Sequence, residues 1–255
     1  MAARRHSNAQ SPGDGTPSRR ARWGAKALVV AGATAVFASP AAAQQTLNVS
    51  LGYFTVRGED ARVERDVLNE NRNVLAFDLG DFNGAVVGAE WLVPLGGYFE
   101  GGAGVGFSRR TVPSVYDRFT DRDGSEIEQR LRLRIVPVAF TVRVLPLGQT
   151  SPVQPYFGGG LGVFSWRYSE SGEFVDFQRG NAIFREQYVA SGSETGPIVF
   201  GGLRFAGDAM SGGFEIRYHG ADAPLGRPFS NLQRDPRIDL GGWTYQLTMG
   251  WRFGG

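Results

Sequence analysis

Residues 243–253, with the sequence WTYQLTMGWRF, decide the fold of this chain. Every second residue in this stretch, beginning with Trp243, is large and apolar, and the residues between them are polar or small. Because successive side chains of a β-strand point to opposite faces of the sheet, this period of two predicts a strand with one apolar face. The same alternation recurs in seven other stretches of about ten residues: 47–53, 84–94, 98–108, 130–144, 156–164, 199–205 and 214–219.

The connections between the eight stretches alternate in length and composition. Those at 94–97, 146–152 and 206–212 are short and turn-like, whereas those at 57–82, 112–129, 169–193 and 220–239 are long and charged. Short turns at one end and long loops at the other are typical of a transmembrane β-barrel, with turns in the periplasm and loops outside the cell. The sequence therefore predicts an all-β fold, a transmembrane antiparallel up-and-down β-barrel of eight strands.

A soluble β-sandwich or a lipocalin-like barrel would also contain alternating strands. In such proteins the second face of each strand points to water and carries charged residues. Here the second face is rich in glycine, which suits the crowded interior of a narrow barrel. The apolar face also carries aromatic residues near strand ends, where a membrane-interface girdle would place them: Tyr53, Trp91, Phe99, Phe107, Trp243 and Phe253. These two features favour the membrane barrel.

One stretch changes its pattern midway. Arginine and apolar residues alternate in 130–135, and the apolar residues then move to the even-numbered positions of 136–144. A β-bulge near Pro137 would explain this shift, because one extra residue exchanges the two faces and proline has no N–H to lose from the ladder. An arginine that faces lipid at the membrane midplane costs about 2–4 kcal/mol. We therefore expect lumen-facing or rim positions for four arginines: Arg110, Arg130, Arg132 and Arg134. At the rim they would either contact lipopolysaccharide phosphates or be solvated or paired with loop residues.

The composition excludes several kinds of site. The chain of 255 residues has no cysteine and two histidines, so it forms no disulfide, thiol nucleophile or thiolate zinc site. The glycine-rich stretches 102–106 and 158–162 lie within expected strands and open no helix, so they predict no nucleotide cofactor. Residues 121–126 (DRDGSE) are similar to part of a calcium loop but lack flanking helices. We expect neither a cofactor nor a bound metal.

Residues 1–43 have the features of a secretory signal peptide. A basic stretch ending at Lys26 precedes an apolar core, 27–38, and the small residues 41–43 precede Gln44. We expect cleavage after Ala43, which leaves residues 44–255 as the exported barrel domain. The leader holds six of the 27 basic residues and one of the 25 acidic residues, so the remaining chain is slightly acidic. No nucleic-acid partner is therefore expected.

The pattern resembles the OmpA/OmpX-type family of eight-stranded outer-membrane β-barrels over nearly all of residues 44–255. The resemblance is carried by 155–162 (PYFGGGLG), 214–219 (FEIRYH) and 240–253. It implies a monomer in the outer membrane of a Gram-negative cell, in contact with outer-membrane lipids and lipopolysaccharide. It also implies assembly by periplasmic chaperones and the outer-membrane assembly machinery, which reads a C-terminal signal that here contains Gly250, Trp251 and Phe253.

Charged residues on the inward face are expected to form a network in the periplasmic half of the lumen. If the strands rise and fall as assigned, the inward-facing charges are Glu90, Glu100, Arg204, Glu215, Arg217 and Arg252. They should pair with one another, because an unpaired buried charge costs several kcal/mol. The network would then set the register and close the lumen, because the interior of about eight strands is normally filled by side chains. The alternative is an ion-conducting or gated path through the network.

An enzymatic alternative rests on residues 217–222 (RYHGAD). This stretch is similar to the His-x-Ser-Asn stretch of PagL-type lipid A deacylases, in which the histidine is the base and the serine the nucleophile. His219 aligns with that histidine, whereas Ala221 occupies the serine position and Asp222 the asparagine position. An alanine has no nucleophilic atom, so a deacylase of this type would be inactive. We therefore expect a non-enzymatic protein, with His219 at the rim.

Two classes of function remain. In the first, the barrel is a structural or surface-interaction protein whose extracellular loops carry the recognition. In the second, it is a small channel for ions or small solutes. Transport of hydrophobic solutes would need an apolar lumen or a lateral opening, and a lumen rich in glycine and charge favours neither.

Overall fold

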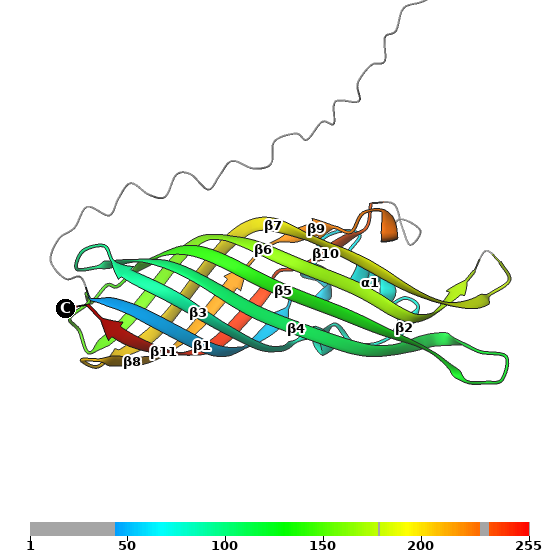
Figure 1. The fold of residues 1–255 in the computed structure, drawn as a ribbon, viewed down its shortest axis with the longest axis horizontal. Coiled ribbons are helices and arrows are strands. Elements are labelled where there is room, and N and C mark those ends of the chain that lie inside the picture. Colours follow the sequence, from blue (N-terminus) through cyan, green and yellow to red (C-terminus); the bar gives the residue numbers. More distant parts are fainter. Residues whose placement is uncertain (1–43, 178, 230–234, 255) are drawn as a thin grey trace, which may run out of the picture. The chain divides into compact units, whose positions relative to one another are not determined.

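Eight long strands close into a ring in the computed structural model, which describes residues 44–177, 179–229 and 235–254 (Figure 1). The strands of the ring are β1 (Gln45–Val56), β3 (Gly84–Pro94), β4 (Phe99–Thr120), β5 (Glu126–Val144), β6 (Val153–Asp176), β7 (Ala182–Ala206), β8 (Met210–His219) and β11 (Gly242–Phe253). All pairs are antiparallel, and β1 closes the ring on β11 with Gln45 opposite Phe253. The predicted eight-stranded up-and-down barrel is confirmed, whereas the predicted signal peptide, 1–43, lies outside the described residues.

A belt of exposed apolar side chains surrounds the ring. Leu51, Phe140, Leu161 and Leu247 are 62–67 % exposed although they lie within strands. Aromatic residues lie on the same outward face near the strand ends, and Trp91, Trp243 and Trp251 are each more than 40 % exposed. Soluble proteins rarely expose so much contiguous apolar surface, whereas a transmembrane barrel presents such a belt to lipid.

Beyond this belt the two faces of the sheet exchange character. On β5, Leu131, Leu133 and Ile135 are buried inside the barrel, whereas Arg130, Arg132 and Arg134 are exposed outside it. The expected β-bulge near Pro137 is wrong, because β5 pairs with β6 in one unbroken register from Gln129 to Val144. A lumen-facing position of these three arginines is excluded, since they point outward just beyond the apolar belt. The apolar parity changes because the apolar face points out to lipid within the membrane but into the barrel beyond it.

Two outer connections are hairpins that continue as paired strands. β4 and β5 stay paired as far as Thr120 and Glu126, and β6 and β7 stay paired as far as Asp176 and Ala182 (Figure 1). The prediction that 112–129 and 169–193 are loops is therefore wrong, because most of these residues belong to paired strands. Inward residues such as Val112, Ile127 and Phe174 are buried, so apolar packing stabilises the extended strands from inside. The short connections 95–98, 145–152 and 207–209 lie at the other end, which we call the turn end.

The other two outer connections fold into the mouth of the barrel. One contains η1 (Glu59–Ala61), α1 (Val67–Asn71), β2 (Leu75–Ala76) and η2 (Leu79–Phe82), and the other contains β9 (Asp222–Pro224), η3 (Arg227–Phe229) and β10 (Arg237–Asp239). Leu68 of α1 and Phe229 of η3 are buried in one apolar core with Leu131, Phe164 and Tyr168 of the barrel wall. We call the described residues of these two connections the outer plug. Within the described residues, none of the helices is long and apolar enough to cross a membrane.

Candidate functional site

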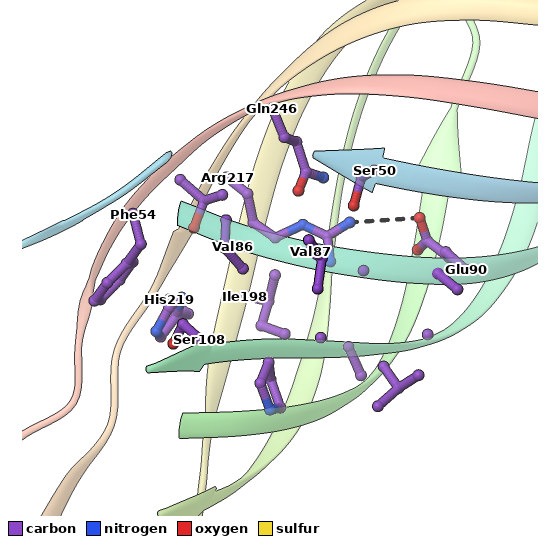
Figure 2. A pocket seen from close by; sticks show the side chains of 18 of the residues that line it. Ser50, Phe54, Val86, Val87, Glu90, Ser108, Ile198, Arg217, His219 and Gln246 are labelled. Atoms are coloured by element: carbon purple, nitrogen blue, oxygen red, sulfur yellow. Dashed lines mark hydrogen bonds and ion pairs between the residues drawn. The ribbon is translucent and has the colours of Figure 1, made fainter. Parts of the chain in front are cut away.

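The interior of the barrel contains an ion-paired cluster around Arg143. Arg143 Nη2 lies 3.2 Å from Glu215 Oε2 and also pairs with Glu90. Arg217 Nη2 lies 2.8 Å from Glu215 Oε1 and 3.5 Å from Glu90 Oε2, and Figure 2 shows its guanidinium reaching toward Glu90. Two arginines thus balance two carboxylates. The four side chains come from β3, β5 and β8, so the cluster joins three separate strands across the lumen. We call it the central cluster.

Neutral side chains complete the central cluster. Thr141 Oγ1 donates to Glu90 at 2.9 Å, Tyr156 donates its hydroxyl proton to Glu215 at 3.1 Å, and Gln246 Nε2 donates to Glu215 at 2.8 Å. The guanidinium of Arg143 also lies over the Tyr156 ring, 4.7 Å from its centre. Buried charges are tolerated when hydrogen bonds and opposite charges replace the lost water. This arrangement therefore fills the middle of the lumen.

A second ion pair lies nearer the turn end. Arg204 binds Glu100 with both terminal nitrogens, at 3.1 Å from Nη1 to Oε2 and 2.7 Å from Nη2 to Oε1. Its Nε donates to Gln154 Oε1 at 2.7 Å, so one planar guanidinium joins β4, β6 and β7. All three side chains are buried. The two-pronged geometry is the one that arginine and carboxylate favour.

Five of the six charges proposed from the sequence belong to these two groups, namely Glu90, Glu100, Arg204, Glu215 and Arg217. Arg252 does not, since its Nη1 donates instead to the carbonyl oxygen of Gly207 at 2.9 Å near the turn end. The sequence reasoning missed Arg143, although this residue is the centre of the larger cluster and is 1 % exposed. Its position between the outward-facing Val142 and Val144 was the signal that could have placed it inside the barrel.

A cavity of about 70 Å³ lies between the central cluster and the outer end of the barrel. Ser50, Glu90, Arg217 and Gln246 contribute polar groups to its lining, as Figure 2 shows. A volume of this size holds a few water molecules, since one needs about 10–15 Å³ of such space. The cavity is therefore too small to form a continuous aqueous channel by itself.

His219 lies at the outer end of this cavity and is buried. Its ring stacks on Phe54 at 5.2 Å and on Phe164 at 4.8 Å, and its Nε2 lies 3.0 Å from the carbonyl oxygen of Leu240. The expectation that His219 lies at the rim is therefore wrong, because the outer plug covers it. The neighbouring Ala221 is also buried, and Asp222 is paired with Arg237.

Polar contacts hold the two connections of the outer plug together. Asp66 caps α1 by accepting from the Asn69 N–H, and it also pairs with Arg62 at 2.6 Å. The backbone N–H of Asp239 donates to Asp66 at 2.7 Å, and Arg62 donates to the Asp239 carbonyl oxygen at 3.0 Å. Asp239 in turn pairs with Arg57. The plug is thus joined by buried charges as well as by apolar packing.

The remaining positions singled out from the sequence lie in ordinary barrel structure. Trp251 and Phe253 point outward from β11, while a side chain at Gly250 would collide with Asn48 and Ser211 inside the barrel. Residues 121–126 form the tip of the β4–β5 hairpin, where Asp123 accepts hydrogen bonds from Ser125. Within the described residues, no group of three or more histidine and carboxylate side chains is placed to hold a metal ion. Arg110 donates to the carbonyl oxygen of Asp81 at 3.1 Å.

No family model and no curated protein matches the sequence. Among solved structures, the outer membrane protein OprG from Pseudomonas aeruginosa is similar, with a TM-score of 0.51 and 12% identity, over 84% of this chain and 97% of that chain. The attachment invasion locus protein Ail of Yersinia pestis has a TM-score of 0.40 and 11% identity, over 84% of this chain and 100% of that chain. Neisserial surface protein A has a TM-score of 0.40 and 10% identity, over 82% and 97%. The similarity to OprG shows that this chain has the fold of an eight-stranded outer-membrane β-barrel.

Proposed function

We propose that this protein is a non-enzymatic barrel of the outer membrane with a structural or surface-interaction role. Its recognition surface is the pair of outer hairpins, β4–β5 and β6–β7. The single observation that carries the proposal is that these hairpins continue beyond the lipid-facing belt as paired strands with a buried inner side. Ordered strands present a defined surface, whereas a lumen filled with ion pairs and a plug favours a structural barrel.

The route to the membrane is part of the same proposal. Residues 1–43 serve as a cleaved signal peptide, and residues 44–255 reach the outer membrane with the help of periplasmic chaperones. The assembly machinery then inserts a monomer by reading the segment that contains Gly250, Trp251 and Phe253. The outward aromatic side chains of this segment and its tightly packed glycine support this assignment.

The proposal is tested by shortening the hairpins without changing the barrel. In one variant an Asn-Gly turn replaces 116–127, so that it joins the paired residues Val115 and Glu128. In the other the same turn replaces 173–185, between the paired residues Gly172 and Glu186. We expect the full-length barrel to confer surface adherence or autoaggregation on cells and the shortened barrels to confer neither, while a heat-sensitive gel shift reports intact folding. If adherence is equal for folded full-length and shortened barrels, the hairpins are not the recognition surface.

A second candidate function is a small channel for ions or small solutes. The observation that favours it is the cavity beside Arg217, the most exposed member of the central cluster with 17% side-chain exposure. Conductance through a planar bilayer tests this candidate directly. A channel gated at the central cluster would conduct, and Arg217→Ala would raise its conductance, whereas a closed structural barrel would give no steps with either protein.

A further inference from the structure

Five exposed arginines form a patch on the outer surface of β4, β5 and β6. Arg109 lies directly opposite Arg134, and Arg134 lies directly opposite Arg167, so three guanidinium groups follow one row across three strands. Arg132 and Arg130 lie on the same face of β5 at the next two outward positions. We call Arg109, Arg130, Arg132, Arg134 and Arg167 the arginine patch.

Among the described residues, the arginine patch has no acidic partner. Within the part of the chain that the structure describes, no ion pair joins any of its five members to a carboxylate, and Arg132 has one side-chain bond, to Thr111 at 3.2 Å. Elsewhere arginines pair regularly, as Arg62, Arg204 and Arg237 do. Like charges directly opposite each other destabilise a sheet. An anionic ligand bound across the row would remove this repulsion.

The position of the patch indicates where that ligand lies. One step closer to the turn end, the outward residue on β4 is Phe107, which belongs to the apolar belt, and on β5 it is the half-buried Val136. On the far side of the patch, Glu128 is the outward residue that follows Arg130 on β5. The guanidinium groups are therefore concentrated where the belt ends, at the depth of the lipid headgroups.

We propose that the arginine patch binds the phosphate groups of lipopolysaccharide in the outer leaflet. This inference rests on the proposed location in the outer membrane. Arginine binds phosphate with two parallel hydrogen bonds. Neighbouring strands are about 4.8 Å apart, so the row of three arginines spans roughly 10 Å. It can therefore contact more than one phosphate oxygen of the same headgroup. Such binding would fix one lipid beside the β4–β5–β6 face and steady the base of both hairpins.

Binding is measured with the folded full-length protein in detergent, titrated with purified lipid A, with lipid A lacking its phosphates, and with phosphatidylglycerol. The test variant is the triple substitution Arg109→Gln, Arg134→Gln and Arg167→Gln. The matched control is Arg118→Gln, Arg122→Gln and Arg179→Gln, which removes the same charge from exposed arginines near the hairpin tips. We expect the test variant to bind lipid A roughly tenfold more weakly or worse, and the control variant to bind like the unchanged protein.

Three results would overturn the proposal. These are equal losses in the two variants, equal binding of lipid A with and without phosphates, and equal binding of phosphatidylglycerol and lipid A. If the test variant does not fold, the triple Arg→Lys variant at the same positions keeps the charge but loses the two-pronged geometry, and it should still bind more weakly. Adherence and cell fractionation report on the proposed function separately, because they do not require lipid A binding by the purified protein.

Discussion

Arg143 and Glu215 face each other across the interior of the barrel, with Nη2 and Oε2 3.2 Å apart and both side chains at most 1 % exposed. One residue comes from β5 and the other from β8, which are not neighbours in the ring. Their attraction therefore holds opposite walls of the barrel at a fixed separation, in addition to the backbone ladders that join adjacent strands.

Substitution of Arg143 should destabilise the barrel strongly. Arg143→Met leaves Glu90 and Glu215 with Arg217 as their remaining cationic partner, and breaking a buried pair costs about 3–5 kcal/mol. Urea titration of the protein refolded in lipid vesicles measures this loss as a lower free energy of unfolding. Arg252→Met is the control, because Arg252 lies outside both ion-paired groups and should change stability by about 0.5 kcal/mol or less. Similar losses in the two variants would contradict a special role for Arg143.

Leu68 should hold the outer plug in place. This side chain is 0 % exposed and packs in the core formed by α1 and the barrel wall. Leu68→Ala leaves a cavity and should lower the free energy of unfolding by about 2–5 kcal/mol. Residues 57–83 should therefore become accessible to protease in intact vesicles. Glu70→Ala on the exposed side of the same helix should leave the cleavage rate unchanged. Equal cleavage of both variants would show that packing by Leu68 does not hold the plug.

Glu170 should make the outer plug sensitive to pH. It lies on β6 beyond the apolar belt, where burial raises the pKa of its carboxyl above the usual range. The folded protein therefore favours the neutral acid, so the stability that Glu170 contributes is present at low pH. That stability is lost as the pH rises from the ordinary glutamate pKa through the raised one.

The substitution Glu170→Gln tests this pH dependence. Glutamine can still accept hydrogen bonds from Asn71 at 2.6 Å and Tyr168 at 2.8 Å, but it cannot ionise. Protease protection of the plug, measured from pH 4 to pH 8, should decline less with rising pH in this variant. Burial also raises the pKa of Asp239, so a residual pH dependence should remain in both proteins. Parallel profiles for the two proteins would exclude a contribution from Glu170.

Gly250 should be required for close packing between β1, β8 and β11. A methyl group added there meets the side chains of Asn48 and Ser211, and overpacking of this kind costs about 1–3 kcal/mol. Gly250→Ala should therefore lower the folded fraction recovered from outer membranes, as seen by the heat-sensitive gel shift. Gly212→Ala on β8 is the control, since nothing lies within 4 Å of its added methyl group. A normal folded fraction for Gly250→Ala would contradict the steric argument.

The strands were predictable because their alternation is local. In 243–253 each residue contrasts with the next, and this contrast identifies both the strand and its lipid-facing side without reference to other parts of the chain. The same reasoning failed on 130–144, where the change of parity suggested a bulge that is absent. The parity reflects the surroundings of the strand, and the point at which a strand leaves the membrane depends on all its neighbours.

The interior was predictable only in part. Alternation places Glu90, Glu215 and Arg217 inside the barrel, but it does not say which of them meet. His219 similarly could be assigned to the end of a strand, whereas its burial between Phe54 and Phe164 depends on a plug contributed by two distant connections.

The sequence by itself determined that the chain forms eight strands with one apolar face each, because that information lies in the contrast between adjacent residues. The tertiary structure decided which charges pair, where the outer plug lies and which arginines of the described residues have no acidic partner. These features depend on closure of the ring, since closure brings β3, β5 and β8 around one lumen and sets Arg109, Arg134 and Arg167 side by side. Contacts between residues so far apart in the chain follow from strand register and barrel geometry, which no local pattern contains.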